Sequence, residues 1–289
     1  MIGFMNRTRT VTLAIAFLYL IGFLFLARYD YSFSAYLTSH ASAAFILAGA
    51  RLGPLPAMIV TAYAIFVLSN YREWYRVYHV AGLGVLAFAA FSIIKPDLSS
   101  LSEILLVIVI WFVLFLIVRA LPQPEFTLRN ERILQFGIVI TAGSAFAVQV
   151  LKLLWGRPRF YALNLYDLAF VPWYRIAGFA WRPDAFRSFP SGHTNGAAAV
   201  FFLVFLPVLF PDRFRRKWIW WVICSGYTAL VGLTRIMAGM HYISDVMGGC
   251  FLYLLAFAAG AAVLERKNIG LFRNREEGGE SNGHEIQKQ

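Results

Sequence analysis

Charged side chains are scarce in this sequence of 289 residues: Asp, Glu, Lys and Arg together make up 14% of it. Hydrophobic residues make up 60%, and aromatic residues alone 17%. A water-soluble globule of this size needs more polar side chains to cover its surface. The shortage of charge therefore argues against a soluble protein and favours the lipid bilayer as the solvent.

Cysteine and acidic residues are also few. The two cysteines, Cys224 and Cys250, lie inside apolar runs without the spacing of metal ligands, and they do not indicate a redox compartment. The 26 basic residues outnumber the 15 acidic ones, which leaves a net charge of +11. Such an excess can indicate binding to nucleic acid, but the positions of the basic residues are better explained by a membrane. We therefore expect no nucleic-acid partner.

Long apolar runs, in contrast, are abundant. Eight of them are long enough to cross a hydrocarbon core about 30 Å thick. They lie near residues 11–27, 54–69, 77–94, 101–120, 133–154, 192–210, 218–237 and 243–264. We therefore expect an all-α fold, a polytopic membrane helix bundle of about eight transmembrane helices.

Two N-terminal segments need separate interpretation. The first apolar run follows two arginines, as in a signal peptide, but it is long and no small-x-small cleavage site precedes Arg28, so we interpret it as an uncleaved anchor. The segment 34–56 is interrupted by His40, Arg51 and two prolines. We expect it to be re-entrant or interfacial rather than a ninth span.

The basic residues fall largely on one side of an eight-helix bundle with both chain ends on that side. The segments placed there and rich in Lys and Arg are 7–9, 72–76, 119–132, 213–217 and 266–288. Because such loops stay in the cytoplasm, both termini are predicted to be cytoplasmic. Compact loops and the lack of eukaryotic retention signals favour an integral protein of a bacterial inner membrane.

The stretch "LKLLWGRPRF", residues 151–160, breaks this charge pattern. Lys152 and Arg159 are seven positions apart, and Pro158 ends the helix between them, so two cations meet at the outer surface. Charges at membrane depth need partners or a function. Arg157 has two open interpretations, a contact with a substrate head group or an interfacial structural role.

The stretch "FPSGH", residues 189–193, begins the next apolar run. Ser191 is a good N-cap residue, and Gly192 allows a ligand to approach the backbone. Amides at a helix N-terminus attract anions. His193 would then stand within reach of a bound anion; the alternative is an interfacial histidine on a capped helix.

The stretch "TRIMAGMHYISD", residues 234–245, contains a third group. His241 and Asp245 are four apart and share a face of a helix, so the carboxylate can hold one imidazole nitrogen while the other points away. If the helix is continuous, Arg235 lies about one and a half turns earlier, but Gly239 offers a place where the helix can break. A His–Asp pair beside an arginine at membrane depth is rarely a matter of packing alone.

Taken together, the three stretches resemble the signature motifs of the type 2 phosphatidic acid phosphatase (PAP2) superfamily, which read K-x6-R-P, P-S-G-H and S-R-x5-H-x3-D. Two residues depart from the pattern: Phe160 replaces the proline of the first motif, and Thr234 replaces the serine of the third. The matching residues cover 152–245, about a third of the chain. The change at Phe160 puts only the local turn after Arg159 in doubt.

The resemblance implies a PAP2-like transmembrane catalytic core of six helices in residues 77–265. Residues 1–76 then form N-terminal transmembrane helices outside the core, to which the sequence assigns no role. Residues 266–289 form a polar cytoplasmic tail, which we expect to be disordered.

By this resemblance the reaction is hydrolysis of a phosphate ester or pyrophosphate without metal or cofactor, through a covalent phosphohistidine. His241 is the expected nucleophile, Asp245 fixes its tautomer, and His193 protonates the leaving oxygen and then activates water. A transferring phosphoryl group needs its oxygens neutralised. The residues expected to bind phosphate are Lys152, Arg159, Ser191, Gly192 and Arg235.

The expected substrate is a lipid phosphate or diphosphate of the lipid A, undecaprenyl diphosphate or phosphatidylglycerophosphate type, reached from the periplasmic or outer face among membrane lipids. The connection between Arg159 and Phe189 is rich in aromatic residues and arginines, and it either helps to choose the head group or forms an unselective interfacial belt. A lipid phosphotransferase using the same intermediate and, less favoured, an anionic-lipid transporter remain alternatives. The sequence does not indicate an oligomeric state.

Overall fold

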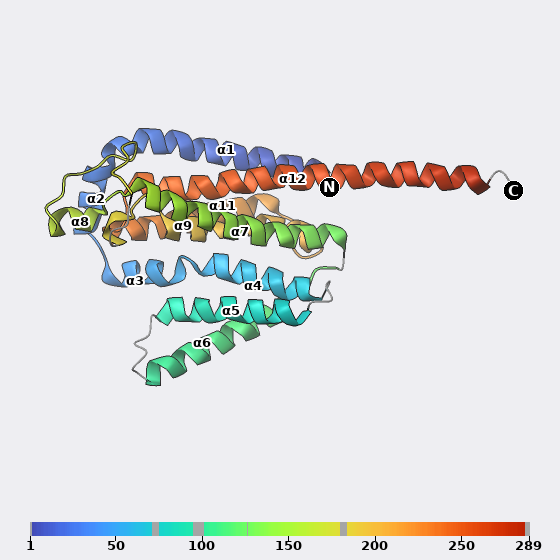
Figure 1. Cartoon of the computed structure of the whole chain (residues 1–289), viewed down its shortest axis with the longest axis horizontal. Coiled ribbons are helices and arrows are strands. Elements are labelled where there is room, and N and C mark those ends of the chain that lie inside the picture. Colours follow the sequence, from blue (N-terminus) through green and yellow to red (C-terminus); the bar gives the residue numbers. More distant parts are fainter. Residues whose placement is uncertain (1, 71–74, 95–100, 126, 180–183, 287–289) are drawn as a thin grey trace.

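The chain folds as a bundle of helices, shown in Figure 1. The computed structural model describes residues 2–70, 75–94, 101–125, 127–179 and 184–286, and these contain no strand. The α-helices are α1 (Ile2–Leu26), α2 (Asp30–Ser39), α3 (Ala43–Leu52), α4 (Leu55–Ser69), α5 (Tyr75–Ile94), α6 (Leu101–Ala120), α7 (Leu128–Trp155), α8 (Phe160–Leu165), α9 (Gly192–Ala198), α10 (Leu206–Leu209), α11 (Lys217–Met237) and α12 (Ile243–Ile286). Short 3₁₀ helices are η1 (Ala27–Tyr29), η2 (Asp184–Phe186) and η3 (Ala199–Phe205).

Eight helical segments of the described chain are long and apolar enough to cross a membrane. They are Arg7–Ser39, Ala43–Ser69, Tyr75–Ile94, Leu101–Ala120, Leu128–Leu165, Gly192–Leu209, Trp218–Met237 and Ile243–Arg266. The prediction of an all-α polytopic bundle with about eight spans is confirmed, and the chain is an integral membrane protein.

The expectation for the segment 34–56 is corrected by the structure. Residues of α2 end the first apolar span, and α3 begins the second, nearly in line with α4 (Figure 1). The segment is therefore the connection between two spans and not a separate re-entrant piece. The breaks at residues 40–42 and 53–54 interrupt the helices only locally. The helix α3 still packs on α11, where Gly49 and Gly53 are buried beside Thr234 and Val231.

Aromatic side chains fill the centre of the bundle, where α7, η3 and α12 pack together. Phe205 and Phe257 are fully buried, and the ring of Phe136 lies 5.4 Å from the first and 5.1 Å from the second, in edge-to-face geometry. The helix α1 lies along α12, while α5 and α6 extend the bundle beyond α4 (Figure 1). Two of the motif stretches therefore lie on or next to α7 and α12, which pack together at this aromatic centre.

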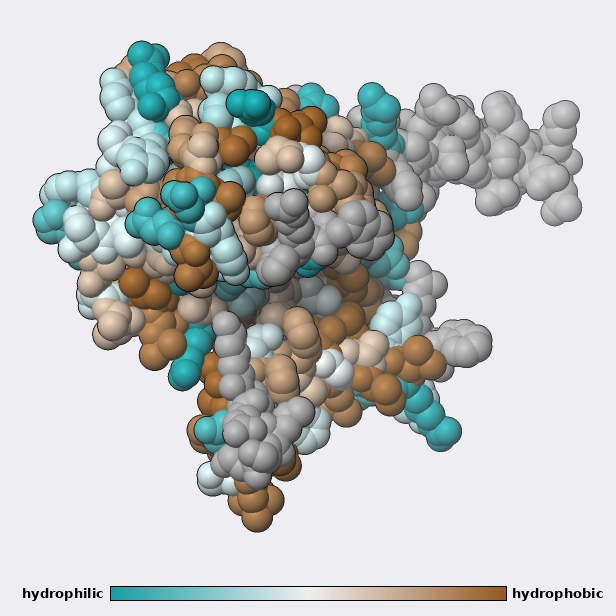
Figure 2. All heavy atoms as spheres, turned by 60° about the vertical axis from the view of Figure 1, so that its left-hand side comes forward, coloured by the Kyte–Doolittle hydropathy of each residue, from teal (hydrophilic) through white to brown (hydrophobic). Residues whose placement is uncertain are grey.

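One end of the bundle gathers the loops that carry the motifs. The helices α7 and α11 end there, α9 and α12 begin there, and α2 and α8 lie across it (Figure 1). With this end brought forward, Figure 2 shows hydrophilic side chains in teal scattered over it and hydrophobic ones in brown on the lower part of the molecule. The start of α1 and the basic turn 213–216 lie at the opposite end.

The helix α12 continues to Ile286, into the segment for which composition predicts disorder. Many residues beyond the membrane-spanning part are Glu, Arg and Lys, which are good helix formers, so the helix can propagate from its buried first half. The division into 1–76, 77–265 and 266–289 stays a prediction.

Candidate active site

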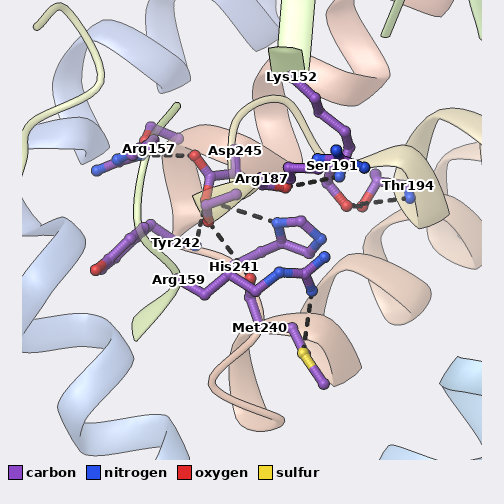
Figure 3. A network of polar contacts seen from close by, with 12 residues as sticks. Lys152, Arg157, Arg159, Arg187, Ser191, Thr194, Met240, His241, Tyr242 and Asp245 are labelled. Atoms are coloured by element: carbon purple, nitrogen blue, oxygen red, sulfur yellow. Dashed lines mark hydrogen bonds and ion pairs between the residues drawn. The ribbon is translucent and has the colours of Figure 1, made fainter. Parts of the chain in front are cut away.

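The three motif stretches come together at the loop end of the bundle (Figure 3). Lys152 lies in the last turn of α7, Ser191 caps α9, and Asp245 lies in the first turn of α12. The backbone amide of Ser191 donates a hydrogen bond of 2.9 Å to the carbonyl of Asp245, which joins two of these elements directly. Residues nearly a hundred positions apart thus share one buried cluster.

The chain turns sharply just after α7 and just after α11. Gly156 follows α7 with φ of 58°, and Gly239 follows α11 with φ of 65°. Both values lie in the left-handed region, which a glycine adopts without the clash of a Cβ atom. His241 therefore lies in the turn between α11 and α12, and not on the continuous helix that its spacing from Asp245 suggests.

His241 and Asp245 nevertheless face each other as predicted. Nδ1 of His241 lies 3.7 Å from Oδ2 of Asp245, too long for a hydrogen bond, and it has no hydrogen-bond partner among the described residues. Figure 3 shows the opposite edge of the ring turned toward the space between Arg159 and Ser191. One ring nitrogen is thus directed at a carboxylate and the other at the space that the cations surround.

Asp245 is held by three donors besides its contact with His241. Its Oδ1 accepts a hydrogen bond of 2.6 Å from Nη1 of Arg157. Its Oδ2 accepts hydrogen bonds from the hydroxyl of Ser188 and from the amide of Tyr242, the latter at 2.8 Å. A carboxylate that accepts several hydrogen bonds and faces a guanidinium is stable in its ionised form. The orientation of Asp245 is therefore fixed before any substrate arrives.

The imidazole of His241 is 1% exposed and lies in the turn between two membrane-spanning helices. Burial, followed by the nearby cations Lys152 and Arg159, lowers its pKa to about 3, although Asp245 acts in the opposite direction. A base whose pKa is lowered stays neutral above that value. The free protein therefore holds His241 in the neutral form that a nucleophile requires.

This lowered pKa gives a first prediction. Nitrogen-15 spectra of the histidine-labelled protein should show the ring of His241 neutral from pH 8 down to about pH 5, whereas an exposed histidine titrates near pH 6.5. Because the unfolded chain takes up this proton and the folded one does not, the protein should also lose stability as the pH falls below about 6.5. The signal of His241 is assigned by comparison with the spectrum of His241→Gln. A titration midpoint of His241 near pH 6.5 would contradict the prediction.

The cationic side chains of Lys152 and Arg159 act on His241 from close by, and Arg235 lies near Arg159. Nζ of Lys152 donates to the carbonyl of Arg187 at 2.9 Å. Arg159 forms an ion pair of 2.7 Å with Asp184. Arg235 donates from Nη2 to the carbonyl of Ile46 at 3.1 Å, and its buried Nε has no partner among the described residues. Since these contacts are mostly to backbone carbonyls, much of the positive charge remains available to an anion.

The start of α9 differs in one respect from the expectation. The hydroxyl oxygen of Ser191 accepts a hydrogen bond of 3.3 Å from the backbone amide of Thr194, as predicted for an N-cap residue. The amide of Ser191, however, is already bonded to the carbonyl of Asp245 and is not free to bind phosphate. Ser191 thus shapes the site, and Gly192 and the half-buried His193 in the first turn remain the predicted contacts.

Arg157 does not lie where a head-group contact would place it. Its side chain is fully buried, and besides Asp245 it contacts Asp30 at 2.9 Å. Its Nε donates to the carbonyl of Val171 at 2.8 Å, and the ring of Tyr242 lies 4.1 Å from the guanidinium carbon. The structure therefore favours a structural role for Arg157, inside the protein rather than at the membrane interface.

Sequence reasoning missed three residues of this cluster: Asp30, Ser188 and Ser244. Asp30 carried a signal, because an acidic residue at the end of an apolar span needs a partner. The two serines carried none, since a hydroxyl beside a motif is common. All three are almost completely buried.

The connection between Arg159 and Phe189 packs on the site end of the bundle. The amide of Tyr161 donates to the carbonyl of Gly239 at 3.0 Å, and the ring of Trp173 lies 4.3 Å from that of Phe23. Trp181 and Arg182, which belong to the same connection, lie outside the described residues. Its influence on the head group stays a prediction.

Comparison with known proteins finds lipid phosphatases that are similar to part of this chain. The chain is 39% identical over 72 residues to phosphatidylglycerophosphatase B of Bacillus subtilis, which covers 24% of this chain and 36% of that protein. It is 43% identical over 81 residues to lipid A 1-phosphatase of Rhizobium johnstonii, which covers 28% of each chain. It is 46% identical over 65 residues to lipid A 1-phosphatase of Rhizobium etli, which covers 22% of this chain and 24% of that protein.

The matches thus span 36% or less of these relatives' lengths, and no solved structure matches the chain significantly. The PAP2 superfamily model matches residues 133–268, which hold all three motif stretches and the whole His241 cluster except Asp30, so this part of the chain is similar to the PAP2 superfamily.

Proposed function

We propose that this protein is an enzyme that removes phosphate from a lipid phosphate or diphosphate, through a phosphohistidine formed on His241. The observation that carries the proposal is a neutral, buried His241 held between the carboxylate of Asp245 and the cations Lys152 and Arg159. A nucleophile oriented by a carboxylate and a positive cradle for phosphate oxygens are the two requirements of phosphoryl transfer to histidine. Relatives named as phosphatases of two different membrane lipids support the substrate class.

The first step transfers the phosphoryl group to the enzyme. His241 keeps its proton on Nδ1, facing Asp245, so Nε2 has a free electron pair and attacks phosphorus. The bond from phosphorus to the leaving oxygen breaks, and protonated His193 gives that oxygen a proton. Lys152, Arg159 and Arg235 neutralise the three remaining phosphoryl oxygens, and Asp245 approaches Nδ1 as the ring becomes positive.

The second step restores the enzyme. His193, now neutral, takes a proton from water, and the water oxygen attacks phosphorus. The bond between phosphorus and Nε2 breaks, its electron pair returns to the ring, and inorganic phosphate leaves. If an alcohol or phosphate of a second lipid replaced water, the same residues would perform a phosphotransfer.

We further propose that the site faces the periplasm and receives its substrate from within the membrane. Positively charged segments stay in the cytoplasm, and the basic turn 213–216 lies at the end of the bundle opposite to His241. The walls of the bundle are apolar, so a lipid can keep its chains in the bilayer while its phosphate reaches the cations.

The test is release of inorganic phosphate from a panel of lipids by the purified protein in detergent. The panel holds phosphatidylglycerophosphate, lipid A and undecaprenyl diphosphate, each with and without acceptor lipids, and with an excess of EDTA in parallel. We expect release from at least one lipid, without need of an acceptor and undiminished by EDTA, because cations of the protein itself neutralise the phosphate. Product formed only with an acceptor would indicate a phosphotransferase, and loss of activity in EDTA would rule out the metal-free mechanism.

A further inference from the structure

Asp30 connects the N-terminal helices to the catalytic cluster. It is the first residue of α2, directly after η1 ends the first apolar helix, and its side chain is 1% exposed. It lies about a hundred residues before the segment 133–268 that matches the superfamily. A carboxylate at this depth is costly unless it is paired and hydrogen-bonded.

The Asp30 carboxylate accepts hydrogen bonds at both of its oxygens. Its Oδ1 accepts a hydrogen bond of 2.9 Å from the backbone amide of Ser244. Its Oδ2 accepts a hydrogen bond of 2.9 Å from Nη2 of Arg157 and a second hydrogen bond from the hydroxyl of Ser244. The hydroxyl oxygen of Ser244 in turn accepts a hydrogen bond of 2.8 Å from Nη1 of Arg157. The hydroxyl proton of Ser244 is therefore directed to Asp30. This pattern fits an ionised carboxylate, which accepts hydrogen bonds at both of its oxygens.

Arg157 therefore lies between two carboxylates, Asp30 and Asp245, and the three buried groups together carry one negative charge. If Arg157 faced Asp245 alone, its charge would cancel that of Asp245. The positive charge that develops on His241 during phosphoryl transfer would then meet only other cations, Lys152 and Arg159, and would be destabilised.

We infer that Asp30 is a positioning residue for the reaction. It shares the guanidinium of Arg157 with Asp245, so that Asp245 keeps the negative charge that orients His241 and stabilises its phosphorylated ring. The helices that precede the superfamily match thus complete the active site rather than only anchoring it. This inference rests on the proposed function.

Further contacts hold Asp30 in place. The helix α1 packs along α12, and the ring of Phe23 in α1 lies 6.4 Å from that of Phe189, next to the cap of α9. From α2, Thr38 donates to the carbonyl of Ile236 at the end of α11. The N-terminal segment is thus attached to each of the elements that carry the second and third motifs.

The test compares Asp30→Asn and Asp30→Glu with the wild type, on the lipid that gives the highest phosphate release. We expect Asp30→Asn to lower kcat by about 10- to 100-fold with KM changed less than about threefold, and to reduce the acid-labile phosphohistidine trapped by rapid quenching. Asp30→Glu, which keeps the charge, should restore kcat to within about tenfold of the wild type. Ser34→Ala is the matched control, because Ser34 is a buried residue one turn later on α2 whose hydroxyl has no partner among the described residues.

The outcomes separate the role of Asp30 from the proposed function. If the wild type releases phosphate and folded Asp30→Asn has the same kcat, or if Asp30→Asn and Asp30→Glu lose the same amount, the positioning role is wrong while the function stands. If the wild type releases no phosphate from any lipid, both fall together. Should Asp30→Asn fail to fold, Ser244→Ala decides: we expect a several-fold lower kcat at unchanged KM, and an unchanged kcat would overturn the inference.

Discussion

Replacing His241 by alanine is expected to abolish phosphate release, with a loss of about 10⁴-fold or more in kcat. The imidazole is the group whose free nitrogen faces the cation-lined space, and its other nitrogen faces Asp245. Without the imidazole, the cations can still bind the lipid phosphate, but no side chain accepts its phosphoryl group, and water would have to attack the phosphorus directly. The measurement is inorganic phosphate released per folded molecule, together with the phosphohistidine trapped by rapid quenching.

The control for this variant is His40→Ala. His40 lies at the same end of the bundle but is exposed and bonded only within its own turn of the chain. It should keep wild-type activity. Because His241 is buried, His241→Gln is prepared as well, so that a lost side-chain volume is not mistaken for lost chemistry. Full phosphate release by folded His241→Ala would refute the enzyme mechanism.

Asp245→Asn is expected to lower kcat by about 10³- to 10⁴-fold, as the corresponding change does in catalytic triads. Asparagine loses the charge that stabilises the positive ring of His241. Its amide group would also direct a donor at Arg157 or at the hydroxyl of Ser188, where the carboxylate accepts hydrogen bonds now. Substrate binding depends on the cations instead, so KM should change little.

Glu265→Gln is the matched control for Asp245→Asn. Both residues lie on α12, but Glu265 is at the far end of its membrane-spanning part, where it pairs with Arg9 at 3.1 Å. Its activity should equal that of the wild type. If folded Asp245→Asn kept more than a tenth of the activity, Asp245 would not have the role assigned to it here.

The membrane fold was predictable because lipid imposes a simple constraint on sequence. A helix that crosses the bilayer must satisfy its backbone internally and cover about 30 Å with apolar side chains, and both requirements act locally. All eight runs correspond to spans in the structure. The error concerned 34–56, where two breaks in the apolar pattern suggested a separate element although tertiary contacts with α11 keep α3 in the second span.

The site was partly predictable for a different reason. Lys152, Arg159, His241 and Asp245 are recognisable by their types and spacing, and the structure places them together (Figure 3). Spacing could not show that His241 lies in a turn, or that the amide of Ser191 is already used by Asp245. Both depend on how α9 meets the start of α12.

By itself, then, the sequence determined the membrane class and the number of spans, and it singled out the groups for which we propose phosphate binding and nucleophilic attack. Only the tertiary structure decided which groups hold Asp245. Arg157 meets Asp30 across 127 positions of the chain, and Ser244 meets the same carboxylate across 214. No local periodicity encodes such contacts, because they arise when separate helices pack and a buried charge must find the donors and counter-charges that packing brings to it.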